Sequence, residues 1–114
     1  MAVQEPTFFI LTALAERPLH GYGVMQAVGE LSAGRLTLRA GTLYAALDRL
    51  TDDGLVVVDR EEAVDGRLRR YYRLTDHGAA ELHAEVERLR ANASLAAARL
   101  RKAGRLRPAA GGVG

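Results

Sequence analysis

The sequence is poor in several kinds of residue, and each scarcity excludes a class of protein. It has no cysteine and no tryptophan, with two phenylalanines and four tyrosines among its 114 residues. Without cysteine the chain can form neither a disulfide nor a thiolate metal site, which agrees with a reducing cytoplasm. Long apolar runs are also absent. The run "FFILTALA", residues 8–15, is far shorter than the roughly 20 residues of a membrane span. We therefore expect a cytoplasmic protein without a membrane partner, in which residues 8–15 form a buried helix.

Residues suited to catalysis are few and scattered. Ser32 and Ser94 are the only serines, and His20, His77 and His83 are the only histidines. The last two are six residues apart, which does not place them on one helical face. No metal-ligand spacing and no glycine-rich phosphate loop is present. We therefore predict that the protein is not an enzyme and uses no metal or cofactor.

The charge is small overall but unevenly distributed. The formal net charge is +2, and 15 of the 16 basic residues are arginine. Residues 67–73 carry four arginines and no acid, directly after three acids in residues 61–66, and residues 99–107 carry five basic groups. Arginine suits bidentate contact with phosphate, so the clustering favours an anionic partner. The total arginine content is equally well explained by genomic base composition.

Hydrophobic spacing and capping signals predict four helices. They cover residues 6–16, 21–32, 41–53 and 75–103. Gly54 fits a left-handed cap after the third helix, and Thr75 fits the N-cap of the fourth. In the third helix Leu43, Leu47 and Leu50 share one buried face. The outward face of that helix is expected to carry Thr42, Ala45 and Arg49, with Tyr44 at its margin.

Two β-rich stretches predict a hairpin. The runs "LVVVDRE" and "LRRYYRL" are rich in β-branched and aromatic residues, and Asp65-Gly66 between them is a strong turn signal. The intervening "EAVDGR" suggests a loop of moderate length. The alternating stretch "RLTL", residues 35–38, predicts one further short strand.

The order of these elements predicts a mainly α fold with a small β-hairpin. Three helices followed by a hairpin is the plan of a winged helix-turn-helix, in which the third helix enters the major groove and the hairpin lies over the adjacent backbone. We assign residues 1–74 to this DNA-binding domain, residues 75–104 to a long C-terminal dimerisation helix and residues 105–114 to a disordered tail.

Three stretches carry a family resemblance that covers roughly residues 8–100. They are "HGYGVMQAV" at 20–28, "LRAGTLYAALDRLTDDGLV" at 38–56 and "RRYYRLTDHGAAEL" at 69–82. With these motifs the chain resembles PadR-family transcriptional regulators, and its length resembles the short subfamily with one C-terminal helix. The resemblance implies a dimeric winged-helix repressor whose C-terminal helix forms the dimer.

The residues expected to bind DNA lie on the third helix, at the start of the second and on the wing. The resemblance implies that Tyr44, the tyrosine of "GTLY", contacts the DNA backbone, and it marks positions 70 and 72 of the wing as typical. The full expected set is Tyr22, Arg39, Gly41, Thr42, Tyr44, Arg49, Arg67, Arg69, Arg70 and Tyr72.

Several of these roles have alternatives in the sequence. Tyr44 could instead pack half-buried on the wing, and Arg49 could pair with Asp52 or Asp53. Acids at 61, 62 and 65 could neutralise part of the wing arginines across the hairpin. Tyr22 is expected to be partly buried with its hydroxyl at a phosphate or backbone group. His20 is expected to be a structural cap rather than a catalytic base.

A 4-3 apolar spacing along the fourth helix predicts a coiled-coil-like dimer seam. The expected interface comprises Leu82, Val86, Leu89, Ala93, Ala96 and Leu100, with Phe8 and Phe9 of the first helix. A two-fold dimer would read a pseudo-palindrome. We therefore expect a sequence-specific homodimeric repressor whose partner is a double-stranded DNA operator. A small-molecule effector of unknown identity could act through the seam. The alternative is a winged-helix protein–protein interaction module without operator binding.

Overall fold

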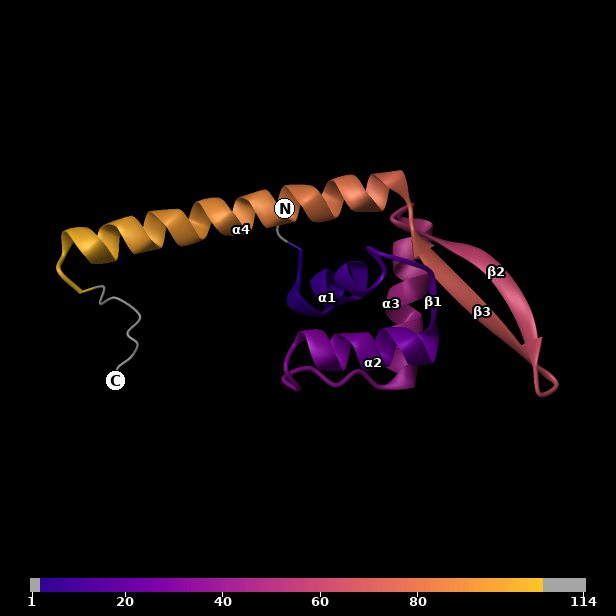
Figure 1. The fold of residues 1–114 in the computed structure, drawn as a ribbon. Coiled ribbons are helices and arrows are strands. Elements are labelled where there is room, and N and C mark those ends of the chain that lie inside the picture. The colour runs from indigo at the N-terminus through magenta and orange to yellow at the C-terminus, as the bar shows by residue number, and fades with distance from the viewer. Residues whose placement is uncertain (1–2, 106–114) are drawn as a thin grey trace. The chain divides into compact units, whose positions relative to one another are not determined.

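The computed structural model describes residues 3–105 and has the predicted winged helix-turn-helix order (Figure 1). Its elements are α1 (Glu5–Ala13), β1 (Leu19–His20), α2 (Gly21–Leu31), α3 (Ala40–Asp52), β2 (Val56–Val64), β3 (Arg67–Leu74) and α4 (Asp76–Lys102). The expected tail lies outside the described residues, apart from Arg105. The chain divides into two compact units, and the boundary along the chain falls between His83 and Ala84 within α4.

The helices largely match the predicted ranges, and α1 differs most. Glu5 lies in its first turn beside a proline, as suits a helix start, but α1 ends at Ala13, three residues before the predicted end. The chain turns at Leu14, whose amide is shared between the carbonyls of Ile10 and Leu11. None of the helices described within residues 3–105 combines the length and the apolar character that crossing a membrane requires.

The sheet corrects the prediction of a strand at residues 35–38. Those residues form no strand, and the third strand is instead β1, which pairs antiparallel with Tyr71 and Tyr72 of β3. The alternation in "RLTL" has another cause: Leu38 is buried and Leu36 packs against the core from an irregular segment. The amide of Leu36 donates to the Ser32 hydroxyl at 3.0 Å, so a side chain supplies the acceptor that a neighbouring strand would supply.

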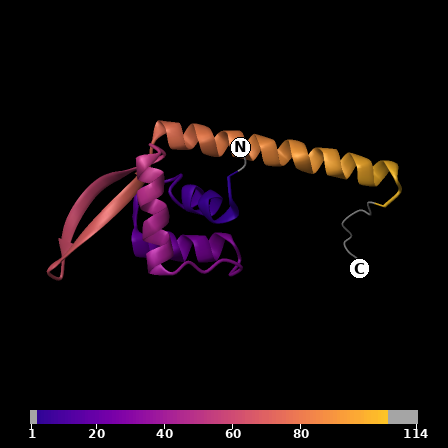
Figure 2. The same ribbon diagram turned by 180° about the vertical axis from the view of Figure 1, so that it is seen from behind.

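The hairpin turn is tighter than the predicted loop of moderate length. β2 continues to Val64, and only two residues connect it to β3. Asp65 and Gly66 both have positive φ, at 50° and 76°, which is the backbone of a type I′ turn. This turn matches the twist of paired strands, so the acids at 61 and 62 lie in the ladder opposite Arg70 and Arg69. In both views the hairpin extends away from α1, α2 and α3 (Figures 1 and 2).

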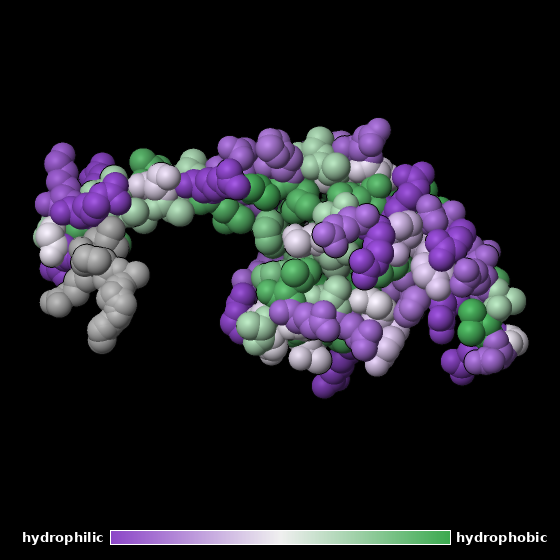
Figure 3. All heavy atoms as spheres, viewed as in Figure 1, coloured by the Kyte–Doolittle hydropathy of each residue, from purple (hydrophilic) through white to green (hydrophobic). Residues whose placement is uncertain are grey.

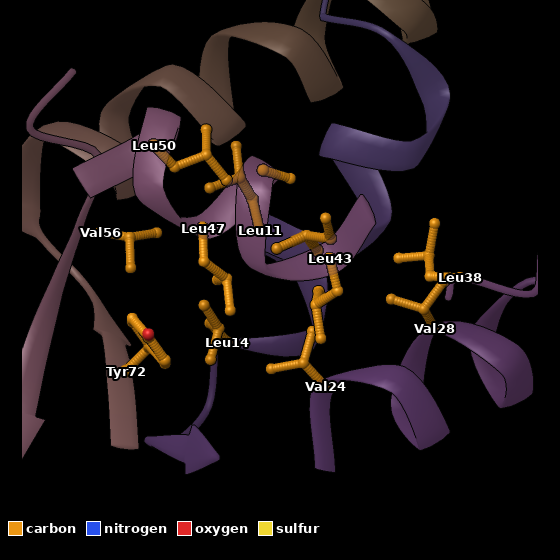
Figure 4. Close-up of a cluster of buried hydrophobic side chains, with 12 residues drawn as sticks. Leu11, Leu14, Val24, Val28, Leu38, Leu43, Leu47, Leu50, Val56 and Tyr72 are labelled. Carbon is orange, nitrogen blue, oxygen red and sulfur yellow. The ribbon is translucent and has the colours of Figure 1, made fainter. Parts of the chain in front are cut away.

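The core of the first unit is built from α1, α2, α3 and the base of the hairpin (Figure 4). Leu43, Leu47 and Leu50 are all buried, as their spacing predicts. The other fully or nearly buried hydrophobic residues are Ile10, Leu11, Leu14, Val24, Val28, Leu38, Ala46, Val56 and Tyr72. Since these side chains come from every element around α3, the core fixes which face of α3 remains in solvent.

The start of α4, which belongs to the first unit, is held by two short contacts to the residues after α3. The Thr75 hydroxyl accepts from the Gly78 amide at 2.9 Å, which confirms the predicted N-cap, and donates to the Gly54 carbonyl at 2.6 Å. A Cβ on Gly78 would lie 2.0 Å from the backbone oxygen of Leu55. Only glycine therefore permits this approach of helix to backbone.

The second unit, from Ala84 onward, exposes apolar side chains along α4 (Figure 3). Leu89 and Leu100 of the expected seam are 43% and 42% exposed, and Ala93 and Ala96 are also exposed. An amphipathic helix with its apolar stripe in water is unfavourable for a lone chain, because burying that stripe against a partner releases water from it.

Candidate nucleic-acid interface

α3 presents a small, mostly uncharged surface to solvent over its first two turns. Gly41, Thr42 and Ala45 are exposed on these turns, opposite the buried leucines, and Tyr44 is 44% exposed, while Arg49 is exposed in the third turn. Small side chains on an exposed helix allow its backbone to approach another surface closely. A helix of this width can enter the major groove of B-DNA, where Thr42 and Arg49 could hydrogen-bond and Ala45 could contact a thymine methyl group.

The two arginines of this region are not held by acids. Arg39 is the N-cap residue of α3 and forms no ion pair within residues 3–105. Arg49 forms no ion pair with Asp52, Asp53 or any other part of the chain that the structure describes. The ion pairs of Arg49 with Asp52 or Asp53, considered from the sequence, are therefore not formed. Both guanidinium groups are available to an anion or a base edge.

The start of α2 brings His20 and Tyr22 beside the same region. His20 is the N-cap, as expected, and its Nδ1 accepts from the Gly23 amide at 3.2 Å. Partial burial and the positive charge of Arg69 lower the pKa of His20, and Glu62 opposes them. The neutral imidazole required of an acceptor is therefore favoured near neutral pH. Tyr22 is 62% exposed rather than partly buried as predicted, because it projects from the first turn of α2, its ring stacked on that of His20 with centroids 6.5 Å apart.

The wing arginines divide into paired and unpaired groups. Arg70 Nε lies 3.1 Å from Glu61 Oε2, and Arg73 Nε lies 3.3 Å from Asp59 Oδ1. The cross-strand neutralisation considered from the sequence therefore occurs at Arg70, through Glu61, whereas Asp59, the partner of Arg73, was not among the acids considered. Arg67 and Arg69 are exposed and have no ion pair among residues 3–105. The unpaired charge of the wing is thus concentrated beside the turn.

Tyr72 differs from its predicted place in the DNA-binding set. It is 3% exposed and belongs to the hydrophobic core, beside Val56 (Figure 4). Successive residues of a strand point to opposite faces, so of the two adjacent tyrosines Tyr72 faces the helices and Tyr71 faces outward. Tyr71 is covered in turn by Arg60, whose guanidinium carbon lies 3.9 Å from the ring centroid. Tyr72 therefore supports the base of the wing as a structural residue.

An open hollow of about 880 Å³ lies between the wing, the start of α2 and the middle of α3. It is lined by His20, Gly21, Tyr22, Tyr44, Asp48, Val64, Asp65, Arg67, Leu68, Arg69, Arg70 and Tyr72. All five predicted site residues of α2 and the wing line the hollow together with Tyr44, whereas Arg39, Gly41, Thr42 and Arg49 do not. Asp48 and Leu68 also line the hollow but were not among the site residues predicted from the sequence. Asp48 follows Tyr44 by four residues, and this helical spacing is the signal that could have placed it in the hollow.

The expected dimer residues lie in different surroundings. Phe8 and Phe9 are partly buried and meet edge to face, with centroids 5.6 Å apart. Leu82 packs partly against the core of its own unit, because the first turns of α4 are anchored there, so its side chain is less free for a partner than the seam pattern suggests. Val86 is half-buried, and the remaining seam residues are exposed.

Comparison with known proteins agrees with this arrangement. The model of the "Transcriptional regulator PadR-like family" matches residues 10–84. The transcriptional regulator Rv3488 of Mycobacterium tuberculosis is 44% identical over 73 residues, which span 64% of this chain and 64% of the relative. The chain thus spans somewhat less than two thirds of that relative's length.

Solved structures of PadR-family regulators are also similar to this chain. The crystal structure of Bacillus subtilis PadR in complex with operator DNA is similar with a TM-score of 0.65 and 26% identity, over 73% of this chain and 48% of that one. A PadR family transcriptional regulator from Eggerthella lenta is similar with a TM-score of 0.64 and 28% identity, over 83% of this chain and 80% of that one. Since the family model covers well over half of the sequence and the winged-helix fold is shared, the chain belongs to the PadR-like family of transcriptional regulators.

Proposed function

We propose that this regulator binds a pseudo-palindromic DNA operator as a homodimer and represses transcription. The observation that carries the proposal is the hollow between α3 and the wing, bordered by exposed tyrosines and by the unpaired arginines Arg67 and Arg69. Hydroxyl and guanidinium donors around a concave surface suit the phosphate backbone, which supplies most of the affinity of DNA-binding proteins.

In this proposal the surface divides into positioning and reading groups. Arg67, Arg69 and Tyr44 contact phosphates and fix the register of the protein on the duplex. The exposed face of α3 lies in the major groove, where Thr42 and Arg49 read base edges. Arg39, at the N-cap of α3, contacts either a guanine edge or the adjacent phosphate. The operator complex of the B. subtilis relative supports a DNA partner of this kind.

The homodimer is supported by the exposed apolar stripe on the second unit. Leu89, Ala93, Ala96 and Leu100 recur at the 4-3 spacing of a helical seam and are all exposed in the single chain. Pairing two such helices about a two-fold axis would cover the stripe and duplicate the DNA-binding surface. A two-fold dimer would read half-sites about one helical turn, roughly 34 Å, apart. A small-molecule effector would act by altering that spacing through the seam. We place this activity in the cytoplasm, with the DNA.

The test is fluorescence anisotropy of the purified full chain on labelled duplexes from its own upstream region, at two salt concentrations. A scrambled duplex of the same composition is the control. The proposal requires binding of one dimer that prefers the upstream duplex and weakens steeply with salt. A folded dimer that binds every duplex equally weakly would instead favour the role of a protein-interaction module, and a pull-down with the exposed face of α3 altered would then test that role.

A further inference from the structure

Two sequence motifs that are distant along the chain meet at one point in the structure. Gly21 of "HGY" is the first residue of α2 and is buried, and Tyr44 of "GTLY" lies on α3. A Cβ added to Gly21 would lie 2.2 Å from the Tyr44 hydroxyl oxygen, 2.6 Å from Cζ and 3.0 Å from Cε1. The tyrosine ring therefore rests on the bare backbone at the start of α2.

This contact distinguishes Gly21 from the other glycines of the same helix. A Cβ on Gly23 would meet its nearest atoms at 3.6 Å, which is ordinary van der Waals contact, and a Cβ on Gly29 would meet nothing within 4 Å. The φ angle of Gly21 is not positive, so the backbone conformation itself suits any residue. The requirement for glycine at this position is one of space, and the space is occupied by Tyr44.

The position of the tyrosine hydroxyl follows from that space. Tyr44 is still 44% exposed, so its ring has one side against α2 and another side open to solvent in the hollow. Any side chain on Gly21 would displace the ring, since atoms at 2.2 Å and 2.6 Å overlap far beyond van der Waals contact. The free direction for such a displacement is outward into the hollow, toward the surface proposed to receive a phosphate.

We propose that Gly21 is a positioning residue for DNA binding: its missing side chain sets where the Tyr44 hydroxyl meets the phosphate backbone. The proposal rests on the proposed function, since it names how one group of that DNA surface is held. In this chain the glycine of one motif leaves the space that the tyrosine ring of the other motif occupies. Gly21 acts through Tyr44 and makes no contribution to DNA binding by itself.

The experiment compares four variants of the full chain: Gly21→Ala, Gly29→Ala, Tyr44→Ala and the double variant Gly21→Ala/Tyr44→Ala. Gly29→Ala is the matched control, because it makes the same substitution in the same helix with open space around the new methyl group. Each variant is measured by thermal unfolding and by anisotropy on the operator duplex. Circular dichroism first establishes that each variant is folded.

The proposal predicts that Gly21→Ala weakens operator binding about tenfold or more, as expected for loss of a hydrogen bond to a charged group. Gly29→Ala should bind like the wild type. Gly21→Ala should also melt at a lower temperature than Gly29→Ala. In the double variant both defects of Gly21→Ala should vanish relative to Tyr44→Ala, because the displaced ring is gone.

Two results would overturn the proposal. If Gly21→Ala binds the operator as tightly as Gly29→Ala does, the space left by Gly21 for the Tyr44 ring is unimportant for binding. If the double variant binds far more weakly than Tyr44→Ala, Gly21 acts independently of Tyr44. A wild-type protein that binds no DNA would overturn the proposed function and with it the role in DNA binding. The melting temperatures would then still decide whether the Tyr44 ring depends on the space at Gly21. If the double variant melts at the same temperature as Tyr44→Ala, this packing contact is supported, and if it melts at a lower temperature, the contact is contradicted.

Discussion

Arg70 Nε lies 3.1 Å from Glu61 Oε2, and the two residues are direct partners in the register of the hairpin. The hydrogen bond to Glu61 and the nearby Tyr72 hydroxyl raise the pKa of Arg70. Both side chains of the pair are about half exposed, so water and salt screen it. The charge of Arg70 is nevertheless compensated before DNA arrives. Glu61 thus reduces the positive charge that Arg70 can offer to a DNA phosphate.

Replacing Glu61 by glutamine should therefore strengthen DNA binding. Glu61→Gln keeps the size of the side chain but removes the negative charge, which leaves Arg70 free for a phosphate. The slope of log affinity against log salt should steepen by roughly one unit. Glu30→Gln, an exposed acid on α2 without an ion pair among the described residues, makes the same change in net charge and is the control. Equal effects of the two variants would mean that only net charge matters.

Arg67 and Arg69 should contribute more to binding than Arg70. Neither has an ion pair in the described part of the chain, so each can neutralise a phosphate without first leaving a carboxylate. Arg67→Ala and Arg69→Ala should each weaken binding to operator and scrambled duplexes by the same factor and flatten the salt slope by roughly one unit. Arg70→Ala should weaken DNA binding less than these two variants do when Glu61 is present. In the Glu61→Gln background it should weaken binding as much as they do. Anisotropy titrations at four or more salt concentrations give all of these slopes.

His20 should make stability dependent on pH. Its Nδ1 can accept from the Gly23 amide only when the imidazole is neutral, and its pKa is lowered in the folded state by burial and by Arg69, against the influence of Glu62. A lowered folded pKa means that stability is fully present above the unfolded value, about 6.5, and is lost as pH falls through the folded pKa. The free energy of unfolding, measured by urea titration at pH 7.5 and pH 5, should therefore fall toward acid.

The His20→Asn variant separates this effect from other titrations. Asparagine is a good N-cap but carries no titrating group, so the variant should lose the part of the pH dependence that belongs to position 20. At pH 7.5 the variant and the wild type should have similar stability. Parallel curves for the two proteins over the whole range would remove His20 as the source.

Gly78→Ala should destabilise the fold although alanine favours helices. The added Cβ would lie 2.0 Å from the backbone oxygen of Leu55, and backbone cannot move aside as a flexible side chain can. Overpacking of this kind typically costs about 1–3 kcal/mol. The measurement is urea unfolding beside Gly29→Ala, whose new methyl group meets nothing within 4 Å and which should be neutral or stabilising. Equal stability of the two variants would contradict the close approach at Gly78.

Local patterns in the sequence were sufficient for most of the fold. The leucine spacing of α3 predicts which face is buried, because a helix repeats its contacts every three or four residues. Asp65-Gly66 predicts the turn, since both positions require positive φ. Thr75 predicts the N-cap of α4 for an equally local reason: its hydroxyl reaches an amide three residues later.

The errors concern partners that are far away in sequence. Residues 35–38 alternate like a strand, but alternation does not reveal whether another backbone lies alongside, and the strand formed at Leu19–His20 instead. Tyr71 and Tyr72 look alike in sequence, and only the packing of α3 against the sheet decides which one is buried. The contact of Gly21 with Tyr44 joins two helices, so neither motif alone could indicate it.

The proposed dimer seam can be tested within α4, which also offers a matched control. Leu89 lies in the 4-3 stripe and is 43% exposed, whereas Leu95 is outside the stripe and is 66% exposed. Leu89→Glu would place a charge in each copy of a helix pair, next to its symmetry mate, and burying such a charge is strongly unfavourable. Leu89→Glu should therefore be monomeric in sedimentation and lose operator binding, because one half-site alone contributes too few contacts. Leu95→Glu adds the same charge to the same helix and should remain a dimer that binds like the wild type. If Leu95→Glu dissociates and Leu89→Glu does not, the dimer uses the other side of α4 and the 4-3 stripe serves another purpose.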